Sequence, residues 1–384
     1  MSSPTRVAIL GSTGSIGSQT LDVIGQHVGR FVVHALAAGS DSAAFRGQVQ
    51  RWRPAVAAVS RATGSPWPFV DTRLLAGEEG LVEVATDPAV DLVVVATSGV
   101  VSIRPTLAAL GAGKRVALAN KEVLVSAGHL VVAAARRAGA VLLPVDSEHN
   151  AIWQCLQGEC PSRVASITLT ASGGAFRDVP VEDLDRVTPW QALQHPTWRM
   201  GPKVTVDSAT LMNKGLEIIE AHWLFGVPID RVDVVIHRES IVHSLVTFVD
   251  GSVKAQLAVP DMRLPIQYAL FYPERVESAV EPLDLVRLAR LSFTAVDPRR
   301  YPALQLVREA GARGGTYPSV LNAANEAAVH LFLDGAIPFT HIVRLVAEVL
   351  DRHTPVENPT LDQVLDADAW ARQTCLDLAT ARVP

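Results

Sequence analysis

Two short acidic segments contain residues of the kind that bind a hard metal cation. Asp146 and Glu148 directly follow an apolar run at 141–145, and Glu217 lies in a helix-like stretch further along the chain. In an extended backbone, alternate side chains point the same way, so Asp146 and Glu148 can reach one cation. Carboxylate oxygens favour magnesium or manganese over zinc. The sequence therefore predicts an all-oxygen metal site made by Asp146, Glu148 and Glu217.

The surroundings of Glu217 add polar residues on one side of a helix. Helical spacing puts Asn213, Glu217 and Glu220 on the same face, with Lys214 beside it. Taken singly, each acid is better explained as a first-turn or solvated helix charge. The combination of acids, an amide and a lysine favours a functional site over that explanation.

A second lysine, Lys121, follows the apolar run 116–118 within the segment Asn120-Lys121-Glu122. This run and the run at 141–145 end at the same edge of the predicted sheet, where ligands collect in open α/β folds. Lys121 is therefore either a polarising or proton-handling group or an ordinary first-turn lysine. Its segment alone leaves both interpretations open.

A glycine turn, Gly11-Ser-Thr-Gly-Ser-Ile-Gly17, follows the first apolar run at 7–10 and opens a helix-like stretch. Glycine permits the tight turn and lets backbone amides approach a pyrophosphate, while the helix N-terminus adds its positive end. Such a turn between a first strand and a first helix favours a dinucleotide. A phosphate loop of the nucleotide-hydrolysing kind is excluded, because Ser18 and Gln19 follow the last glycine where Lys-Ser/Thr is needed.

The kind of dinucleotide stays open at this stage. The second apolar run, 31–36, is followed closely by Ser40 and Asp41. An acid at this point favours NAD, whereas a base favours NADP. Asp41 lies late for the first role, and the arginines at positions 46, 51 and 53 are distant for the second.

The first 145 residues alternate short apolar runs with helix-like stretches. The runs are residues 7–10, 31–36, 56–59, 92–96, 116–118 and 141–145. Continuous rather than alternating apolar residues are typical of parallel strands covered on both faces. The pattern predicts an α/β fold whose N-terminal domain, residues 1–145, is a doubly wound, Rossmann-type sheet of six strands.

Beyond it, the sequence predicts a central α+β catalytic domain at 146–275, a connector at 276–301 and a C-terminal helical bundle at 302–384. Strands are predicted at 166–170, 204–206, 232–237 and 252–257, and helices at 304–310, 318–333, 341–350 and 361–379. The stretch 172–202 is rich in Gly and Pro and too long for a simple connection, which predicts a flap over the site.

The composition excludes several functional classes. The 384 residues are 48% hydrophobic and 19% charged, which suits two or three folded domains. A net charge of −5 without a basic run offers no long-range attraction for nucleic acid, and the longest apolar runs fall short of a membrane span. The scattered cysteines 155, 160 and 375 fit neither a zinc site nor a disulfide framework. With no long apolar leader, these features predict a cytoplasmic protein.

Together these segments resemble the 1-deoxy-D-xylulose 5-phosphate reductoisomerase family. The matching motifs are Gly11-Ser-Thr-Gly-Ser-Ile-Gly, Ala119-Asn-Lys-Glu-Val, Val145-Asp-Ser-Glu-His-Asn-Ala-Ile, Val206-Asp-Ser-Ala-Thr-Leu-Met-Asn-Lys-Gly-Leu-Glu, Asp250-Gly-Ser-Val, Pro260-Asp-Met-Arg-Leu-Pro-Ile and Leu321-Asn-Ala-Ala-Asn-Glu-Ala. They extend from about residue 6 to the C-terminal helices. The resemblance implies a homodimer with an NADPH domain, a catalytic domain and a four-helix bundle.

The resemblance also implies the reaction. Deoxyxylulose phosphate rearranges to an aldehyde, which NADPH reduces to 2-C-methyl-D-erythritol 4-phosphate on the non-mevalonate route to isoprenoids. A divalent cation (Mg²⁺, Mn²⁺ or Co²⁺) takes part, held by Asp146, Glu148 and Glu217. These acids and Lys121 are the implied catalytic residues.

The same resemblance implies the remaining contacts. Ser147, Asn213 and Lys121 are expected to contact the substrate's hydroxyls. Its phosphate is expected to bind Ser172, Ser208, Asn213 and Lys214, with His195 over it. Trp198 and Met200 are expected to lie in the flap. The cofactor contacts are expected at Thr13, Gly14, Ser15, Ile16, Gly39, Asn120, Glu122 and Gly201.

Two departures from the family pattern are visible. Many members have Gly-Lys-Asn where this chain has Gly39-Ser40-Asp41, which puts strict selectivity for NADPH in doubt. Arg238 and Glu239 stand where others often have Pro-Gln, and the sequence assigns them no effect.

Two rival functions fit parts of the sequence. A metal-independent dehydrogenase acting on another phosphorylated aldehyde needs the glycine turn but not the acids. A non-catalytic protein that senses NADP also needs the turn alone, and it offers no reason for three acids. The acids therefore favour the metal-dependent reductoisomerase.

Overall fold

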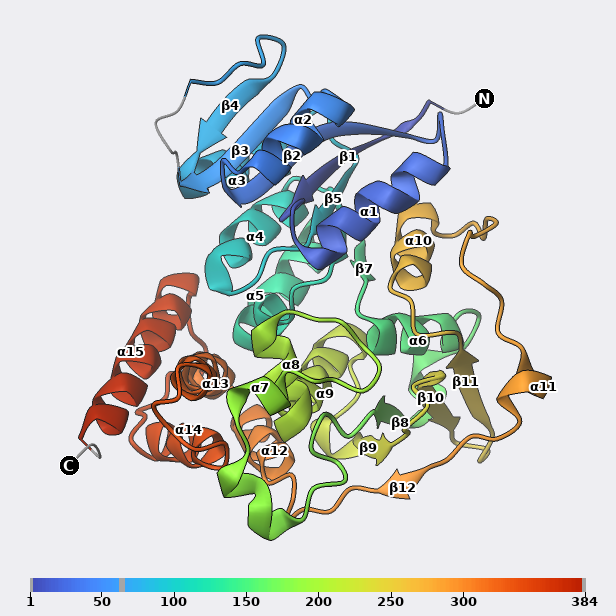
Figure 1. The fold of residues 1–384 in the computed structure, drawn as a ribbon. Helices are drawn as coiled ribbons and strands as arrows, with labels where there is room; N and C mark the ends of the chain where they lie inside the picture. The colour runs from blue at the N-terminus through green and yellow to red at the C-terminus, as the bar shows by residue number, and fades with distance from the viewer. Residues whose placement is uncertain (1–2, 62–65, 382–384) are drawn as a thin grey trace. The chain divides into compact units, whose positions relative to one another are not determined.

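The computed structural model describes residues 3–61 and 66–381, which group into two compact units. The first unit comprises Met1–Val123, His129–Asn150 and Asp261–Glu281. The second comprises Leu124–Gly128, Ala151–Pro260 and Pro282–Pro384. Each unit has its own sheet (Figure 1).

The sheet of the first unit is parallel throughout, as the continuous apolar runs predict. In spatial order its strands are β4 (Arg73–Ala76), β3 (Val56–Arg61), β2 (Phe31–Ser40), β1 (Thr5–Leu10), β5 (Leu92–Val95), β6 (Arg115–Leu118) and β7 (Leu142–Pro144). Among the described residues this is one strand more than the six predicted. The extra strand, β4, is a short edge strand whose side chains are not buried, and no strand was predicted there.

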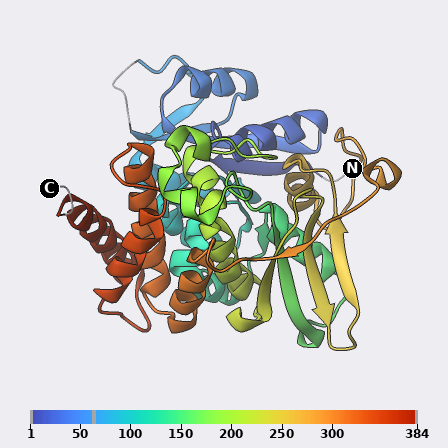
Figure 2. The same cartoon turned by 60° about the horizontal axis from the view of Figure 1, so that its bottom comes forward.

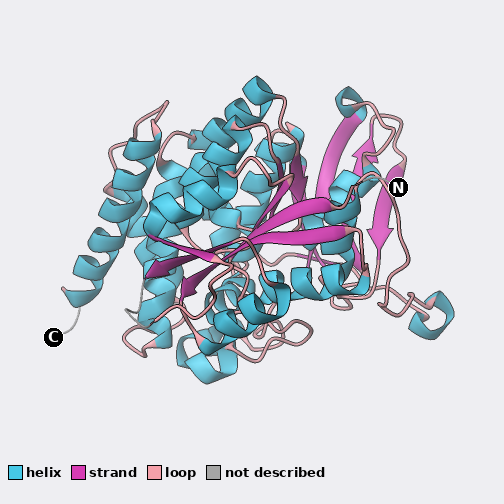
Figure 3. Cartoon of the chain, turned by 90° about the horizontal axis from the view of Figure 1, so that it is seen from above, coloured by secondary structure: helices cyan, strands magenta, loops and turns pink. Residues whose placement is uncertain are grey.

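Helices connect these strands. They are α1 (Ser15–Gln26), α2 (Ala43–Trp52), α3 (Gly77–Thr86), η1 (Val100–Ser102), α4 (Ile103–Gly111) and α5 (Lys121–Ala138). Because crossovers between parallel strands are right-handed, the helices before and after the reversal of strand order cover opposite faces. Figure 3 shows helices on both sides of the twisted strands. The doubly wound fold is confirmed.

A later segment, α10 (Arg263–Phe271), packs on α1 within the first unit. The Phe271 ring makes edge contacts with His27 and Phe31, at centroid distances of 4.6 and 4.9 Å. The exposed pair Arg30–Glu274 spans 2.7 Å. Residues 261–281 thus contact the first unit, although they fall largely inside the predicted catalytic domain at 146–275. The four-part domain division stays a prediction.

The second unit has a mixed sheet in the order β11 (Val253–Leu257), β10 (Val242–Phe248), β8 (Val164–Ala171), β9 (Val232–Ile236) and β12 (Thr294–Ala295) (Figure 2). β8 and β9 are parallel, and the other neighbours are antiparallel. The strands predicted at 166–170, 232–237 and 252–257 are confirmed. The sequence analysis missed β10, whose polar His243 and Ser244 interrupt its apolar residues.

The strand predicted at 204–206 is wrong, because these residues lie in helix α8 (Pro202–Thr210). The β-branched residues Val204, Thr205 and Val206 favour a strand by propensity alone. Pro202 occupies the first helical turn, where its fixed φ suits a helix. Val206 and Ala209 are buried in the helical core of this unit, and that packing outweighs propensity.

The remaining elements of the second unit are mostly helical. They are α6 (Ser147–Cys155), which begins in the first unit, η2 (Pro161–Arg163), η3 (Val181–Arg186), α7 (Pro189–Ala192), α9 (Met212–Phe225), η4 (Ile229–Arg231), α11 (Leu285–Leu288), α12 (Ala303–Arg313), α13 (Tyr317–Leu333), α14 (His341–Asp351) and α15 (Leu361–Thr380). The four helices predicted from residue 304 onward are confirmed as α12 to α15, drawn in orange to red in Figures 1 and 2.

Helix α13 is the centre of this helical core. It is apolar on nearly all sides, and Val320, Val329 and Phe332 are almost fully buried. A helix of this kind must be covered by neighbours, and α12, α14 and α15 all pack on it. Full burial of each large apolar side chain contributes roughly 1.5–3 kcal/mol. Within residues 3–61 and 66–381, no helix combines the length and apolar character needed to cross a bilayer.

The turn from β1 to α1 depends on glycine at two positions. Gly11 has φ +86°, and a Cβ there would lie 2.5 Å from the carbonyl oxygen of Ala96. A Cβ on Gly17 would lie 2.2 Å from the carbonyl oxygen of Gly11. These neighbours are backbone atoms, which cannot move aside as a flexible side chain can. Only glycine at these positions lets α1 start this close to the strand.

We predict that Gly17→Ala lowers the stability of the protein by about 1–3 kcal/mol, because the methyl group overlaps backbone. Gly25→Ala is the matched control, since it lies in the same helix and its Cβ would come no closer than 3.5 Å to Trp52. That control should be neutral or stabilising by up to about 1 kcal/mol. Thermal unfolding of both variants measures the difference, and equal midpoints would contradict this account of the turn.

Candidate active site

The glycine turn of the first unit ends at the N-terminus of α1. Gly14 is the N-cap residue and has no side chain that could cap the helix. Gly14 and Ser15 are exposed, and the predicted cofactor contacts Thr13 and Ile16 flank them. The first-turn amides and the positive end of the helix therefore face solvent, as an anion-binding turn requires.

Asn120 holds the start of α5 against the loop after β5. Its amide group donates to the carbonyl oxygens of Thr97 (2.9 Å) and Gly99 (3.0 Å). Its side-chain oxygen accepts from the Val123 amide at 2.9 Å. The amide nitrogen and oxygen of Asn120 are thus both hydrogen-bonded to backbone, and Glu122 beside it is buried. Direct contact of Asn120 and Glu122 with a cofactor stays a prediction.

The acids Asp146 and Glu148 lie where β7 gives way to α6. The extended backbone predicted for them is wrong, because α6 begins at Ser147 and Glu148 occupies its first turn. Asp146 instead accepts a hydrogen bond from the Glu148 amide at 3.2 Å, as an acid at a helix start does. Carboxylate oxygens of the two residues still lie within 4.8 Å of each other. A helix start brings these acids together as effectively as a strand would.

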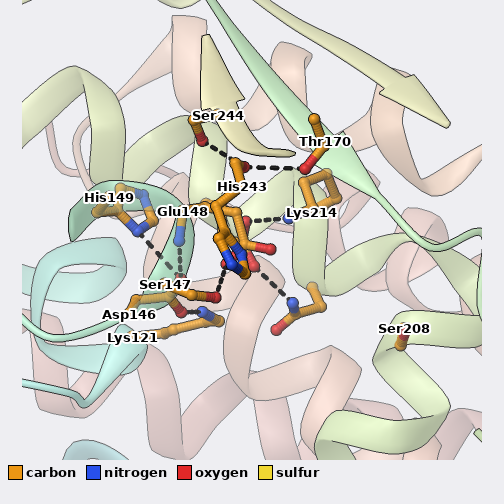
Figure 4. A network of polar contacts seen from close by, with 12 residues as sticks. Lys121, Asp146, Ser147, Glu148, His149, Thr170, Ser208, Lys214, His243 and Ser244 are labelled. Carbon is orange, nitrogen blue, oxygen red and sulfur yellow. Dashed lines mark hydrogen bonds and ion pairs between the residues drawn. The ribbon is translucent and has the colours of Figure 1, made fainter. Parts of the chain in front are cut away.

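Basic groups surround Asp146 (Figure 4). Lys121, the first residue of α5, forms an ion pair with its carboxylate, and His149 Nδ1 lies 3.5 Å from it. Burial opposes ionisation, but the Lys121 ammonium and His149 hold the pKa of Asp146 well below its usual range. Ser147 Oγ donates to Glu148 at 2.6 Å. Asp146 is therefore an anion at neutral pH. Lys121 is a first-turn lysine that pairs with Asp146, and its role in catalysis stays a prediction.

Helix α9 of the second unit carries the third acid, Glu217. Asn213 Nδ2 donates to one of its carboxylate oxygens at 2.6 Å, and Lys214 forms an ion pair with the other. The Glu217 side chain is only 1% exposed, so the amide and the ammonium replace the water it has lost. The predicted shared face of α9 is confirmed, with Glu220 buried one turn further on.

Three residues predicted to bind phosphate converge in the second unit. His195 Nε2 lies 3.0 Å from Ser172 Oγ and 3.1 Å from Ser208 Oγ. Its other ring nitrogen, Nδ1, accepts from the amides of Thr197 (3.1 Å) and Trp198 (2.8 Å). Since Nδ1 accepts, the proton resides on Nε2, which donates toward the serine hydroxyls. Burial, helped by the Arg177 charge, lowers the pKa of His195 to about 4, so the ring is neutral.

The close approach of Ser172 and Ser208 depends on Gly174. Its φ is +69°, and a Cβ there would lie 2.5 Å from the Ser208 carbonyl oxygen. The Gly174 amide donates to Ser172 Oγ at 3.1 Å, and Arg177 donates to the Ser172 carbonyl at 2.9 Å. Gly174 and Arg177 were not among the predicted site residues. The Gly-Gly pair directly after a strand was the signal that could have identified this turn.

A buried network missed by the sequence analysis positions α8. Asp207, next to Ser208, accepts from Asn325 Nδ2 on α13 at 2.8 Å. Lys203 Nζ lies 3.1 Å from its other oxygen. Lys203 lies in α8 itself, so it is the contact with Asn325 that ties the helix carrying Ser208 to the helical core. No local pattern links Asp207 to Asn325, because 118 residues separate them.

The predicted flap, 172–202, is structured over most of its length. It contains η3 and α7, and Phe176, Leu184 and Ala192 are buried in the helical core. The segment after α7 holds the predicted flap residues Trp198 and Met200 and ends at Gly201, the N-cap residue of α8. The ring of Trp198 lies 6.4 Å from that of His243.

The unusual pair Arg238 and Glu239 has a clear structural role. Arg238 binds both carboxylate oxygens of Asp178, one of them at 3.0 Å. Glu239 accepts from Ser292 Oγ at 2.7 Å and lies 3.1 Å from His237 Nδ1. The two residues therefore connect the chain after β9 to the loop that follows Ser172 and to the irregular segment before β12.

Comparison with known proteins covers nearly the whole chain. Family models described as 1-deoxy-D-xylulose 5-phosphate reductoisomerase match residues 7–128, and as its C-terminal domain residues 142–225. A model described as DXP reductoisomerase C-terminal domain matches residues 257–374. The chain is 57% identical to the 1-deoxy-D-xylulose 5-phosphate reductoisomerase of Thermomicrobium roseum and 52% identical to that of Heliobacterium modesticaldum. These alignments span 97% of both chains in the first case, and 98% of this chain and 97% of the relative in the second.

Solved structures of the same enzyme are also similar. The reductoisomerase from Zymomonas mobilis in complex with NADPH has a TM-score of 0.91 at 41% identity, covering 98% of this chain and 99% of that one. A reductoisomerase in complex with NADPH, fosmidomycin and magnesium has a TM-score of 0.90 at 41% identity, covering 98% of each chain.

We predict that the imidazole of His195 titrates near pH 4 and that protein stability falls as the pH drops from about 6.5 toward that value. In this window the unfolded state binds a proton that the folded state does not, so the contribution is complete only above about pH 6.5. NMR titration of labelled histidine measures the pKa, with His195→Gln assigning the signal. That variant should lose this part of the acid sensitivity, and a His195 pKa of 6.5 or above would contradict the lowering of its pKa by burial.

Proposed function

The chain belongs to the 1-deoxy-D-xylulose 5-phosphate reductoisomerase family, and from this premise we propose that it converts 1-deoxy-D-xylulose 5-phosphate to 2-C-methyl-D-erythritol 4-phosphate. NADPH is the reductant, a divalent cation assists, and the product enters the non-mevalonate route to isoprenoids. The observation that carries the proposal is the pair of acids Asp146 and Glu217, each in an ion pair with its own lysine, in a chain that is 57% identical to such an enzyme.

The donor chemistry fits a hard dication. Asp146 and Glu148 of the first unit and Glu217 of the second are all carboxylates, and the lowered pKa of Asp146 keeps that residue anionic. We propose that the three share one Mg²⁺, Mn²⁺ or Co²⁺. When bound, the cation stabilises negative charge that develops on the substrate's carbonyl and hydroxyl oxygens during the rearrangement.

Other residues of the chain hold the substrate. Ser172 and Ser208 present hydroxyls to the phosphate, with Lys214 as the cation. The Nε2–H of His195 orients both hydroxyls, because the ring is neutral and fixed by the backbone at Nδ1. Ser147, Asn213 and Lys121 face the hydroxyl groups of the sugar. Phosphate binding at a distance from the reacting carbons can supply energy for closing the site.

The cofactor binds the glycine turn of the first unit. The backbone amides of Thr13, Gly14, Ser15 and Ile16 would hold its pyrophosphate, and Gly39, Asn120, Glu122 and Gly201 would supply further contacts. The protein supplies position and exclusion of water, while the nicotinamide supplies the hydride. Because most of the flap is anchored in the helical core, the closing part is the segment 193–201 with Trp198.

The exposed apolar surface and the free cysteines support a proposal for assembly and location. We propose a homodimer that uses the edge strand β11 and the arm 282–296, where Val253, Leu285, Val286 and Phe293 are exposed. Cys155, Cys160 and Cys375 are all free thiols, which suits a reducing cytoplasm.

The test of the function mixes the purified chain with 1-deoxy-D-xylulose 5-phosphate, Mg²⁺ or Mn²⁺ and NADPH, and follows the loss of NADPH absorbance. Turnover should stop when a chelator removes the metal and return when the metal is restored. NADPH binding without oxidation would favour a sensing protein. Turnover that survives chelation would favour a metal-independent dehydrogenase.

We predict that Glu148→Gln lowers kcat by at least about a thousandfold, because it removes a charged metal ligand. Glu159→Gln is the matched control, since Glu159 is paired with Lys254 at the surface, and it should retain full activity. Isothermal titration with Mn²⁺ in the presence of NADPH should show weaker metal binding for the first variant only. Unchanged turnover of Glu148→Gln would refute the metal mechanism.

We predict that the double variant Leu285→Glu and Val286→Glu is monomeric, whereas the parent chain is a dimer. Both residues lie in the short exposed helix α11, so charges there should disrupt association without disturbing a core. Val28→Glu and Val70→Glu are the controls, because these residues are exposed and apolar but lie in the first unit. Light scattering after size exclusion gives the masses. A dimeric double variant would exclude this surface.

A further inference from the structure

The end of β2 determines which dinucleotide a fold of this kind accepts. An acid there binds the free ribose hydroxyls of NAD, whereas a base accommodates the 2′-phosphate of NADP. In this chain β2 ends at Ser40, and Asp41 follows it directly. Sequence order alone therefore suggests an obstacle to NADPH.

The structure pairs this acid with an arginine from the next helix. Ser42 caps α2 by accepting from the Phe45 amide at 3.2 Å, which brings Arg46 back over Asp41. Arg46 Nε donates to one carboxylate oxygen at 2.7 Å, and Nη2 donates to the other at 2.6 Å. Nη2 also donates to the carbonyl of Pro66 at 3.2 Å. The guanidinium is thus held in one orientation by two separate partners.

The side chains of Asp41 and Arg46 are exposed to solvent to different extents. The Asp41 side chain is 3% exposed and the Arg46 side chain 30%. A carboxylate whose two oxygens both accept from one guanidinium has little capacity left for ribose hydroxyls. The Nη1 edge of Arg46, opposite the bound Nε–Nη2 edge, is directed away from Asp41. What this corner of the sheet presents outward is therefore the cation rather than the anion.

A second arginine ends the neighbouring strand. Ser40 on β2 is in register with Arg61 on β3, and both residues are exposed. Four side chains therefore lie at or beside these strand ends. Asp41 and Arg46 neutralise each other, Arg61 adds a positive charge, and Ser40 adds a hydroxyl. The sum is one positive charge, which attracts a phosphate dianion and gives NADH no comparable advantage.

We propose that Asp41 and Arg46 together form the element that selects NADPH. Asp41 anchors Arg46, and Arg46 binds the 2′-phosphate with Arg61 and the Ser40 hydroxyl. This inference rests on the proposed function only in that a nicotinamide dinucleotide binds the first unit. The acid whose type alone argues against NADPH instead supports the residue that recognises it.

The test is calorimetric titration of the whole chain, without substrate or metal, with 2′,5′-ADP and with 5′-AMP. These two probes differ only in the 2′-phosphate. The parent chain should bind 2′,5′-ADP at least about tenfold more tightly, with a ratio that decreases as salt is added. Arg46→Gln should reduce the ratio to about one to two, and NADPH and NADH should then bind alike.

Arg51→Gln is the matched control, because Arg51 lies in the last turn of the same helix and is exposed. It should keep the parent ratio. Asp41→Asn should leave 5′-AMP binding unchanged, since Asp41 does not contact the ribose. The double variant Asp41→Asn with Arg46→Gln removes the carboxylate left unpaired by the single change, so it separates loss of recognition from loss of folding. In this double variant, the affinity for 2′,5′-ADP relative to 5′-AMP should also be about one to two.

A parent ratio near one, or an Arg46→Gln variant that keeps the parent ratio, would overturn this inference while leaving the reductoisomerase activity intact. A tenfold loss of 5′-AMP binding in Asp41→Asn would also overturn it, because Asp41 would then bind the ribose. Failure of the parent chain to bind NADPH, NADH and both probes would overturn the proposed function, and this inference with it.

Discussion

Removing a carboxylate from water costs several kcal/mol unless charges and hydrogen bonds compensate it. Both units of this protein meet that constraint in the same way. Asp146 is compensated by Lys121 and His149, and Glu217 by Lys214 and Asn213. These acids are therefore held at fixed positions by cations and hydrogen-bond donors, which is the condition a dication requires of its ligands.

Rigid secondary structure supplies those positions. The acids and lysines lie at the starts of α5 and α6 and on α9, where the helix backbone determines side-chain direction. The residues proposed to bind the substrate's phosphate instead depend on contacts between elements. Gly174 lets the chain after β8 approach α8, and Asn325 fixes α8 through Asp207. Positioning of the site is thus distributed over the core and is not confined to the residues that touch the ligand.

Local patterns were enough to predict much of this protein. Continuous apolar runs predicted the parallel sheet, and helical spacing predicted the shared face of Asn213 and Glu217. The glycine turn was predictable because its geometry depends on a few consecutive residues. In each case the relevant physical interaction lies within about one helical turn or one strand, so the sequence carries it directly.

Tertiary structure decided the features that depend on distant partners. Packing in the helical core made 204–206 helical against its strand propensity, and a helix start replaced the extended backbone expected at Asp146. The neutral, oriented His195 and the pairing of Asp41 with Arg46 likewise exist only in the folded chain. The sequence by itself determined which chemical groups are present and most of the elements in which they lie. Their charge state and direction depend on burial and on partners contributed by other elements, and only folding brings those together.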